Sequence, residues 1–489
     1  MLVDVECHIS NGLPSIVIIG DASKAVEEAR ERLRAGFANS TIEFPRKRVT
    51  INLSPADVPK GSTSLDLPMA VAVLSRSNQI NYQASKDYIF LGELSLEGLL
   101  NPVRGLVGKI LSAKKMNFNK FYIPLSNLEQ ALIIPDIEIK AAASLRDAYL
   151  DLTGTLPLRS ISTGKGRSIV QSSKSDFIDF SEIIGQPIAK RALEIAAAGH
   201  HNILLDGPPG TGKTMLAKAM CGILPDLSPS ELLEVTHLHS LGSGNFGKIV
   251  SIRPFRSPHH SASAIALIGG GSTPKPGEAS LAHRGVLFLD ELPEFNQACL
   301  EALRQPLEDG RVNIVRVKDS ASYPADFILV ATKNPCPCGF YGTLKTCICS
   351  AAAIYKYQKR VSGPILDRID LHLPVHNIDH RNLLKHSVVK AESELVKHRV
   401  ETAYKLQYQR LGPARYNGSM SNKEIRTYAN LSPSAKEFLD NASMKLAISA
   451  RAYVRTVKVA RTIADLGSEL NIKPEHIGEA LQYRHKSTT

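Results

Sequence analysis

The chain has 489 residues, more than one hydrophobic core accommodates, so we expect two to four domains. Its 43% hydrophobic and 22% charged content is typical of a soluble globular protein, and the lack of an 18-residue apolar run argues against a membrane-spanning helix. The net charge of +12 suits a polyanionic partner such as nucleic acid, although many proteins without such a partner are equally basic.

Two further features predict where the protein works. The first seven residues carry acids rather than the bases of a signal peptide, which predicts a cytoplasmic protein. Seven cysteines in a cytosolic chain argue against a disulfide framework, and four of them lie between residues 336 and 349.

The first part of the chain, residues 1–150, mixes short β-like runs such as 15–19 with helical patterns such as 22–37. This alternation predicts an α/β domain. Residues 151–176 are rich in Ser, Gly and Lys with little apolar periodicity, so we expect a flexible linker there.

Two passages of this domain resemble the Lon-protease-like domain: KGSTSLDLPM at 60–69, and a run over 92–109 that ends in GLVGK. The resemblance implies a serine–lysine pair, in which Lys109 takes the place of the lysine and Ser62 or Ser64 that of the serine. Neither serine lies in the Gly-Pro-Ser-Ala-Gly setting of an active enzyme. We therefore interpret the domain as non-catalytic.

A phosphate-binding loop follows the apolar run 202–206 and precedes a helical pattern. It fits G-x-x-x-x-G-K-[ST], in which backbone N–H groups wrap the phosphates, the lysine reaches the β and γ oxygens and the hydroxyl ligates Mg²⁺. Its residues are Gly207, Pro208, Pro209, Gly210, Thr211, Gly212, Lys213 and Thr214. With the Ile-Gly-Gln turn upstream, the loop resembles AAA+ ATPases, which implies that Gly185 and Gln186 contact the adenine.

Two further strand patterns end in polar residues. The apolar run 286–289 leads into Asp290 and Glu291, which would hold the Mg²⁺ shell and orient or deprotonate the attacking water; a helix-capping pair is the alternative. The run 328–332 leads to Asn334, which the AAA+ resemblance places between the γ-phosphate and the water. A turn asparagine before proline is the alternative there.

Four cysteines follow in two C-x-C turns: Cys336, Cys338, Cys347 and Cys349. Four thiolates on two tight turns are the ligand set of a tetrahedral structural Zn²⁺ site. Reduced free thiols and an iron–sulfur cluster are the alternatives, because the commoner zinc spacing is C-x₂-C.

Two arginines complete the AAA+ pattern. The resemblance implies that Arg368 is an arginine finger, supplied to a neighbouring subunit's ATP to neutralise charge on the transferred phosphoryl. An intramolecular ion pair with Asp367 or Asp370 is the alternative. Arg451 matches the sensor 2 arginine.

The C-terminal part predicts helices. A long charged helix over 383–410 lies in a connector that spans 377–420, and residues 421–489 predict a helical lid. We expect Arg455 and Arg461 at the surface of that lid. The AAA+ core itself would span 177–376.

Four segments make the resemblance specific: RSPHH at 256–260, NPCPCG at 334–339, SGPILDRID at 362–370 and ARTIADL at 460–466. They resemble the ComM (YifB) family of the magnesium-chelatase-like AAA+ branch, and the similarity covers nearly the whole chain. The family implies a hexamer in which a helix-2 insert and a pre-sensor hairpin face a central pore.

Basic side chains of those insertions are then candidate DNA contacts, because cations on pore loops can follow a phosphate backbone without reading sequence. Solvated charges and structural loop histidines are the alternatives. The candidates are Arg253, Arg256, His259, His260, Lys275, Arg316 and Lys318.

The expected protein is thus an α/β AAA+ ATPase, with a parallel sheet flanked by helices, a Lon-protease-like domain before it and a helical lid after it. The family implies a hexameric DNA motor that uses ATP and Mg²⁺ and promotes branch migration during natural transformation. The alternative is a chelatase-like or MoxR-like ATPase that remodels a protein or cofactor-insertion partner. An ATP-dependent protease would need the Lys109 pair.

Overall fold

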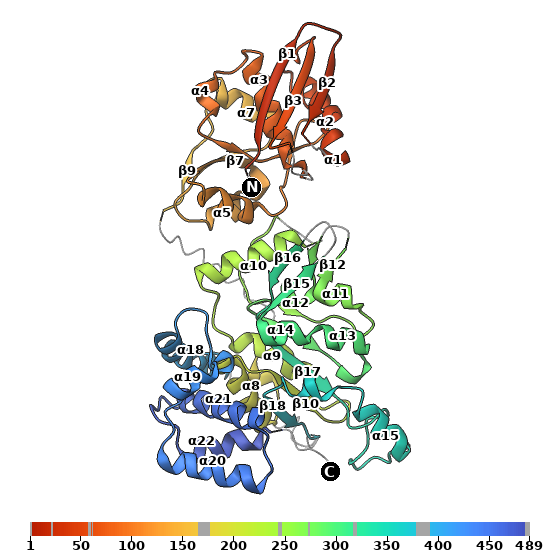
Figure 1. Ribbon diagram of the computed structural model, residues 1–489, viewed down its shortest axis with the longest axis vertical. Coiled ribbons are helices and arrows are strands. Elements are labelled where there is room, and N and C mark those ends of the chain that lie inside the picture. Colours follow the sequence, from red (N-terminus) through yellow and green to blue (C-terminus); the bar gives the residue numbers. More distant parts are fainter. Residues whose placement is uncertain are drawn as a thin grey trace. The chain divides into compact units, whose positions relative to one another are not determined.

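The computed structural model describes residues 2–20, 23–56, 60, 62–164, 177–242, 247–271, 274–315, 320–377 and 392–484. The chain forms two compact units, which are drawn together in Figure 1. The first, the N-terminal unit, comprises Met1–Gln171 and Ser228–Ser251; the second, the ATPase unit, comprises Ser172–Leu227 and Ile252–Thr489. In the described part of the chain, no helix is both long enough and apolar enough to cross a membrane.

The N-terminal unit contains a three-stranded sheet, a four-stranded sheet and a short two-stranded one, with helices packed on them. Its strands are β1 (Asp4–Ser10), β2 (Ser15–Ile19), β3 (Arg48–Ser54), β4 (Ile89–Phe90), β5 (Glu93–Leu94), β6 (Leu100–Asn101), β7 (Lys120–Pro124), β8 (Glu138–Ala142) and β9 (Ile161–Ser162). Its helices are α1 (Lys24–Glu27), α2 (Ala29–Asn39), α3 (Asp66–Arg76), α4 (Tyr82–Ser85), α5 (Leu106–Lys114), α6 (Leu128–Leu132), α7 (Leu145–Leu152) and α10 (Pro229–Leu241).

The three-stranded sheet has the order β1-β3-β2, with β3 antiparallel to β1 and parallel to β2. Strand β3 shows the expected alternation, because its residues Val49, Ile51 and Leu53 are fully buried while the intervening ones are not. They join a core with apolar residues of α2 and α3. The predicted α/β domain is confirmed.

The expected linker at 151–176 is too long at its start. Helix α7 runs to Leu152, β9 pairs antiparallel with β8, and the Thr163 hydroxyl donates to the Ile137 carbonyl. Ladder hydrogen bonds thus keep residues up to 163 in the folded unit, although the segment lacks apolar periodicity. The rest of the expected linker, 165–176, lies outside the described residues.

The N-terminal unit also includes residues 228–251, which were predicted from the sequence to be part of the ATPase core. Helix α10 packs against α5, and the Gln130 side chain donates to the Lys248 carbonyl. The insertion 228–251 is therefore packed with the N-terminal unit.

The ATPase unit is built on a five-stranded parallel sheet that lies between helices. Its strands, including two short hairpins, are β10 (Ile203–Asp206), β11 (Phe255–Arg256), β12 (Gly269–Gly270), β13 (Lys275–Pro276), β14 (Val286–Leu289), β15 (Arg311–Val315), β16 (Ser320–Pro324), β17 (Ile328–Lys333) and β18 (Leu371–Pro374). Its helices are α8 (Pro187–Gly199), α9 (Lys213–Ile223), α11 (Ala264–Ile268), α12 (Glu278–Leu281), α13 (Gln297–Ala302), α14 (Arg304–Asp309), α15 (Ala351–Gln358), α16 (Gly363–Leu366), α18 (Glu392–Leu411), α19 (Asn422–Tyr428), α20 (Pro433–Lys445), α21 (Ala450–Leu466) and α22 (Pro474–Gln482).

The parallel sheet has the order β11-β14-β17-β10-β18, so β17 lies between β10 and β14. Its strands are near-continuous apolar runs, as expected for a sheet covered on both faces. Because neighbouring parallel strands end at one edge, the residues that follow β10, β14 and β17 are brought together. The predicted AAA+ core architecture is confirmed.

The lid consists of α19 to α22, drawn in blue in Figure 1, and its apolar residues share one core with α8, α9 and α18. Helix α21 begins at Ala450, where the Ser449 hydroxyl caps the helix by accepting from the Ala452 N–H. The long charged helix is observed as α18, and its predicted first residues, 383–391, lie outside the described part.

Candidate nucleotide-hydrolysis site

The phosphate-binding loop connects β10 to α9. Gly210 and Gly212 adopt φ angles of +80° and +83°, which side chains other than glycine rarely adopt. Helix α9 then begins at Lys213, so its free N–H groups and its dipole lie at the loop. This arrangement is suited to phosphate oxygens, which the sequence predicts as the ligand of the loop.

Lys213 lies inside the loop. Its Nζ donates to the Gly207 and Pro208 carbonyls, the latter at 2.8 Å, and to Oδ1 of Asn334 at 3.1 Å. Burial lowers the pKa of Lys213 from its ordinary value, and the nearby carboxylates, including Asp206, oppose that shift. The carboxylates thus favour the charged form of this lysine against the effect of burial.

The two acidic residues after β14 take different positions. Oδ1 of Asp290 accepts from the Thr332 hydroxyl at 2.6 Å, and its Oδ2 lies 3.5 Å from the Thr214 hydroxyl. Glu291 has a left-handed φ of +53° and its N–H donates to the Thr332 hydroxyl. Thr214 and Asp290 can thus share one Mg²⁺, while Glu291 is turned away from the strand direction.

Asn334 connects the lysine with the acid. Its Oδ1 accepts from Lys213, and its Nδ2 donates to Oε1 of Glu291 at 3.4 Å. A side chain in contact with both groups can sense the γ-phosphate and position the attacking water. The position favours the sensor interpretation over a turn asparagine.

Two functional contacts were not anticipated from the sequence. Thr332 supports both acidic residues through its hydroxyl, and Lys333 pairs with Asp206 at 3.0 Å. The available signal was that strands β10 and β17 both end in polar residues at the carboxyl edge of the sheet.

The predicted adenine contacts lie in a left-handed turn. Gly185 and Gln186 have φ angles of +68° and +56°, and the Gln186 side-chain amide donates to the His376 carbonyl at 2.6 Å. The turn is thereby tied to the residues that follow β18.

Arg368 forms neither of the ion pairs that the sequence offered. Its Nη2 donates to Glu308 and its Nη1 to the Pro364 carbonyl. Asp370 instead accepts from the buried His201 at 3.3 Å. The guanidinium therefore bridges its own segment and the end of α14.

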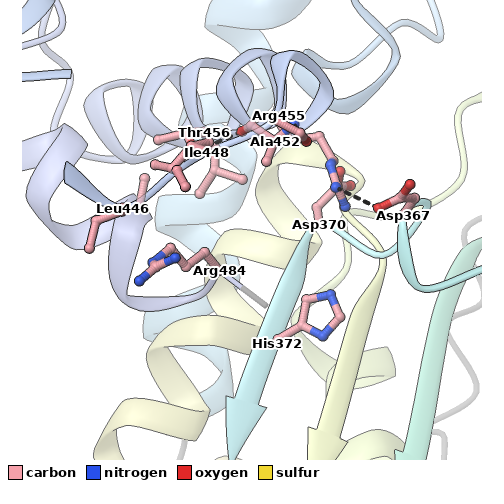
Figure 2. A pocket seen from close by; sticks show the side chains of 13 residues that line it. Asp367, Asp370, His372, Leu446, Ile448, Ala452, Arg455, Thr456 and Arg484 are labelled. Atoms are coloured by element: carbon pink, nitrogen blue, oxygen red, sulfur yellow. Dashed lines mark hydrogen bonds and ion pairs between the residues drawn. The ribbon is translucent and has the colours of Figure 1, made fainter. Parts of the chain in front are cut away.

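A pocket of about 200 Å³ lies where the lid meets β18, and Figure 2 shows Asp367, Asp370, His372 and Arg455 in its wall. Asp367 pairs there with Arg455 at 3.6 Å and with the exposed Arg451 at 3.9 Å. Arg451 is thus placed next to the Arg368 loop and not against the phosphate loop.

The prediction that Arg455 and Arg461 lie at the surface is wrong. Arg461 is 1% exposed and pairs with Asp465 at 2.9 Å, one helical turn further on, while its other N–H groups donate to backbone carbonyls. Arg455 donates to the Ile369 carbonyl at 2.7 Å. Helical spacing indicated an exposed face, but carboxylate and carbonyl partners permit burial of the charge.

The candidate DNA contacts differ in accessibility. Lys275 and His259 are exposed and His260 is partly buried. Arg256 is partly buried and forms a double hydrogen bond with Glu278, with the shorter contact at 2.6 Å. Arg316 and Lys318 lie outside the described residues.

The prediction that Arg253 contacts DNA is wrong. Arg253 is only 7% exposed, and its guanidinium donates to the carbonyls of Pro225, Asp226 and Arg284. A buried arginine that holds three carbonyls cannot follow a DNA backbone, so its role is structural.

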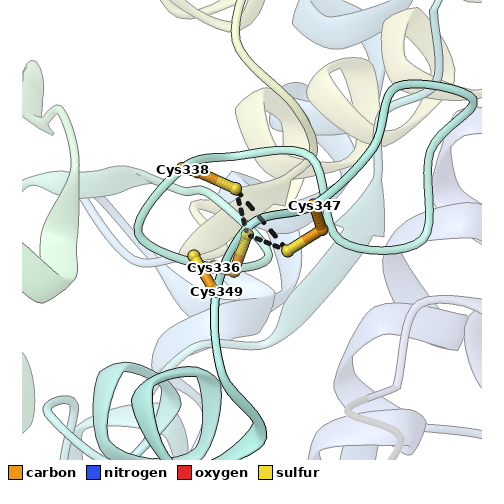
Figure 3. Close-up of side chains that lie close together, drawn as sticks. All are labelled: Cys336, Cys338, Cys347 and Cys349. Atoms are coloured by element: carbon orange, nitrogen blue, oxygen red, sulfur yellow. Dashed lines mark hydrogen bonds between the residues drawn. The ribbon is translucent and has the colours of Figure 1, made fainter.

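The four cysteines converge, as Figure 3 shows. The three Sγ–Sγ distances among Cys336, Cys338 and Cys347 are 3.4, 3.6 and 3.7 Å, and all four sulfurs lie within 4.8 Å of one another. A tetrahedral ion with Zn–S bonds of about 2.3 Å separates its sulfurs by about 3.8 Å. A backbone N–H bond from Phe340 leads the causes that lower the pKa of Cys338 to about 6. At Cys347 and Cys349 the backbone N–H bond that each accepts is outweighed by burial and the neighbouring sulfurs, so the pKa values of these two thiols are raised. The donor set fits a tetrahedral metal ion.

Lys109 and both candidate serines meet in the N-terminal unit. Its Nζ lies 2.9 Å from the Ser62 Oγ and 2.7 Å from the Ser64 Oγ. Burial lowers the pKa of Lys109 to about 8. The sequence context argued against a catalytic pair, yet the lysine and a hydroxyl are within proton-transfer distance.

Three family models match the chain. The magnesium chelatase subunit ChlI model matches residues 179–383, a second model of that subunit matches 5–127, and the model of its C-terminal part matches 390–484.

Individual relatives agree with these matches. The chain is 43% identical to competence protein ComM of Haemophilus influenzae, over 99% of this chain and 94% of that protein. It is 41% identical to the uncharacterised protein YifB of Escherichia coli, over 99% and 94% respectively. The similarity to the magnesium-chelatase 67 kDa subunit of Chlorobaculum tepidum is 30% identity, over 32% of this chain and 23% of that one.

Proposed function

Because the chain belongs to the ComM/YifB family of magnesium-chelatase-like AAA+ ATPases, we propose that it is an ATP-driven ring motor on DNA. The observation that carries the ATPase is the continuous contact from Lys213 through Asn334 to Glu291. This contact joins the phosphate-binding cation, the sensor and the residue that activates water.

Each residue has a defined task in hydrolysis. The loop N–H groups and Lys213 would hold the β and γ phosphates, and Thr214 with Asp290 would hold Mg²⁺, which would supply positive charge to the phosphoryl oxygens. Glu291 orients the attacking water and accepts its proton, while Asn334 fixes the carboxylate.

The proposed ring follows from Arg368. In an AAA+ ring this arginine would exchange Glu308 for the γ-phosphate of a neighbouring subunit. Within this chain the guanidinium pairs with Glu308 of α14, so an anion outside its own loop is within its reach.

DNA as the partner is supported by the exposed Lys275 and His259 of the insertions and by the net charge of +12. One relative is named a competence protein, and for this chain we propose promotion of branch migration as transforming DNA is integrated.

The test is an ATPase and unwinding assay with single-stranded, duplex, forked and four-way-junction DNA. We expect DNA to stimulate hydrolysis, and Lys213→Ala and Glu291→Gln to abolish it. Lys218→Ala, an exposed lysine on the same helix, is the matched control. Hydrolysis indifferent to all four DNAs, without unwinding, would favour the remodelling ATPase.

The Lys109 cluster favours a second candidate function, a serine–lysine peptide hydrolase. A neutral Lys109 would accept the proton of a serine hydroxyl as the oxygen attacks a peptide carbonyl. The lysine would return that proton to the leaving amine, and water would release the acyl group. Ser62, which is more exposed than Ser64, is the hydroxyl that a substrate reaches more easily.

A fluorophosphonate probe tests this candidate directly, because it reacts covalently with an activated serine. We expect labelling that is lost in Ser62→Ala and in Lys109→Met, and kept in Lys115→Met, an exposed lysine at the C-terminal cap of the same helix. Equal labelling of the wild type and Lys109→Met would show that the lysine activates no serine.

A further inference from the structure

The four-cysteine cluster is not needed for any chemical step of ATP hydrolysis, yet it lies directly beside the site. Cys336 follows Asn334 by two residues, and Asn334 bridges Lys213 and Glu291. One end of the cysteine-bearing segment is therefore part of the hydrolysis machinery.

The other end of the same turn touches the phosphate-binding loop. Gly339, which follows Cys338, has a φ of +84°, and a Cβ placed on it would lie 2.5 Å from Cδ of Pro209. The Gly339 N–H donates to the Cys336 carbonyl at 3.0 Å, which closes the turn. The hexapeptide 334–339 thus begins with the predicted sensor residue and contacts the phosphate-binding loop at its other end.

The segment 336–350 has little apolar packing of its own to hold it. Leu344 and Ile348 are exposed, and the described hydrophobic cores contain none of its residues. Its four sulfurs lie close together, and the Tyr341 N–H contacts the Cys336 Sγ at 3.3 Å. A metal ion would supply the folding free energy that a core supplies elsewhere.

We propose that a divalent metal ion held by the four cysteines positions Asn334 and the phosphate-binding loop, so that loss of the metal uncouples nucleotide binding from hydrolysis. The inference rests on the proposed ATPase function. Zn²⁺ is the ion that the ligand set fits best. The cysteines are positioning residues, because they act through Asn334 and Pro209.

The metal itself is tested first. Elemental analysis of the full chain should give about one Zn²⁺ per chain, and Cys347→Ser should give almost none. Cys347→His, which keeps a zinc-binding side chain, should restore it. Cys7→Ser, at a cysteine of β1 outside the cluster, should match the wild type.

The coupling is read by amide hydrogen exchange of the 207–214 peptide as well as by hydrolysis. Metal loss should speed exchange of that peptide and lower kcat about tenfold. Re-adding Zn²⁺ to chelator-treated wild type should reverse both, which keeps the test valid where Cys347→Ser does not fold.

Gly339→Ala separates the effect of the contact between Gly339 and Pro209 from the effect of the metal, because the variant keeps all four cysteines. We expect it to retain Zn²⁺ yet show faster exchange of the 207–214 peptide and lower kcat. Gly342→Ala is the matched control, because this glycine has a φ of +74° in the same segment and nothing within 4 Å of its would-be Cβ.

Wild-type protein without Zn²⁺, or metal-free protein with unchanged loop exchange, would overturn the proposal. The same holds if Gly339→Ala and Gly342→Ala behave alike. Metal-dependent loop exchange in a chain that hydrolyses no ATP would support the coupling and refute the proposed ATPase.

Discussion

Two lysines, Lys213 of the ATPase unit and Lys109 of the N-terminal unit, are largely buried and have opposite surroundings. Lys213 donates to two carbonyls and an amide oxygen, and burial lowers its pKa while three carboxylates oppose that shift. Lys109 lies between the hydroxyls of Ser62 and Ser64, and burial alone lowers its pKa to about 8.

The difference shows that burial alone does not define the chemistry of a lysine. Carboxylates that oppose desolvation favour the cationic form of a lysine, which suits an anionic phosphate chain. Hydroxyls carry no charge, so the amine they surround becomes neutral at a pH near 8 and can accept a proton. The proposals therefore give Lys213 a role as a cation and Lys109 a role as a base, and both roles can be tested.

The largest effect should separate the two lysines. Lys213→Ala removes the only cation within the phosphate-binding loop, so we expect ATP turnover to fall about 1,000-fold while fluorophosphonate labelling of the N-terminal unit stays unchanged. Lys109→Met should abolish the labelling and leave ATP turnover unchanged. Steady-state ATPase and gel-based labelling measure both, and loss of both activities in either variant would break the comparison.

A second cation should come from another subunit. Arg368→Ala should lower ATP turnover about 100-fold, because the transition-state charge loses its second partner. Mixing Arg368→Ala with Lys213→Ala subunits should restore part of the activity, since some interfaces then combine an intact loop with an intact arginine. Arg360→Ala, a surface arginine paired with Glu294, is the control, and an unchanged mixture would place the arginine in its own subunit's site.

The base role of Lys109 predicts a pH profile. The neutral amine is the reactive form, so the labelling rate should rise about tenfold from pH 6 to pH 7 and level off above the pKa of about 8. Below that pH the protonated amine cannot accept the serine proton. Labelling kinetics over pH 6–10 measure this, and a rate without an inflection near 8 would remove the lysine from the reaction.

The sequence predicts the ATPase site well because parallel strands order its parts. Gly207 to Thr214, Asp290 and Asn334 each follow an apolar run, and in a parallel sheet the ends of such runs meet at one edge. Periodicity and motif spacing suffice for residues whose position depends on the strand that precedes them.

Other positions depend on tertiary contacts that no local pattern records. Arg461 can be buried because Asp465 and backbone carbonyls accept hydrogen bonds from its guanidinium. Arg253 can be buried because three backbone carbonyls accept hydrogen bonds from it. The helix α10 lies in the middle of the ATPase sequence, yet it packs with the N-terminal unit. Lys109 meets its serines across more than 40 residues of sequence, as the separations of 45 and 47 show.

The smallest effect concerns an exposed lysine, which extends the comparison of the two buried lysines to one that is in contact with solvent. Lys275 is exposed, so its ammonium would act on DNA as a screened point charge. Lys275→Ala should weaken DNA binding about threefold and lower the slope of log affinity against log salt by about one. Fluorescence anisotropy at several salt concentrations measures both quantities.

Lys436→Ala is the matched control for this variant, because it removes the same charge from an exposed position on α20 of the lid. A nonspecific effect of net charge would shift the affinity of both variants equally while leaving the slope intact. A slope lowered only in Lys275→Ala would show that this cation displaces a counterion from the phosphate backbone. Identical slopes in both variants would remove Lys275 from the DNA-binding surface, and the exposed His259 would then be the next position to test.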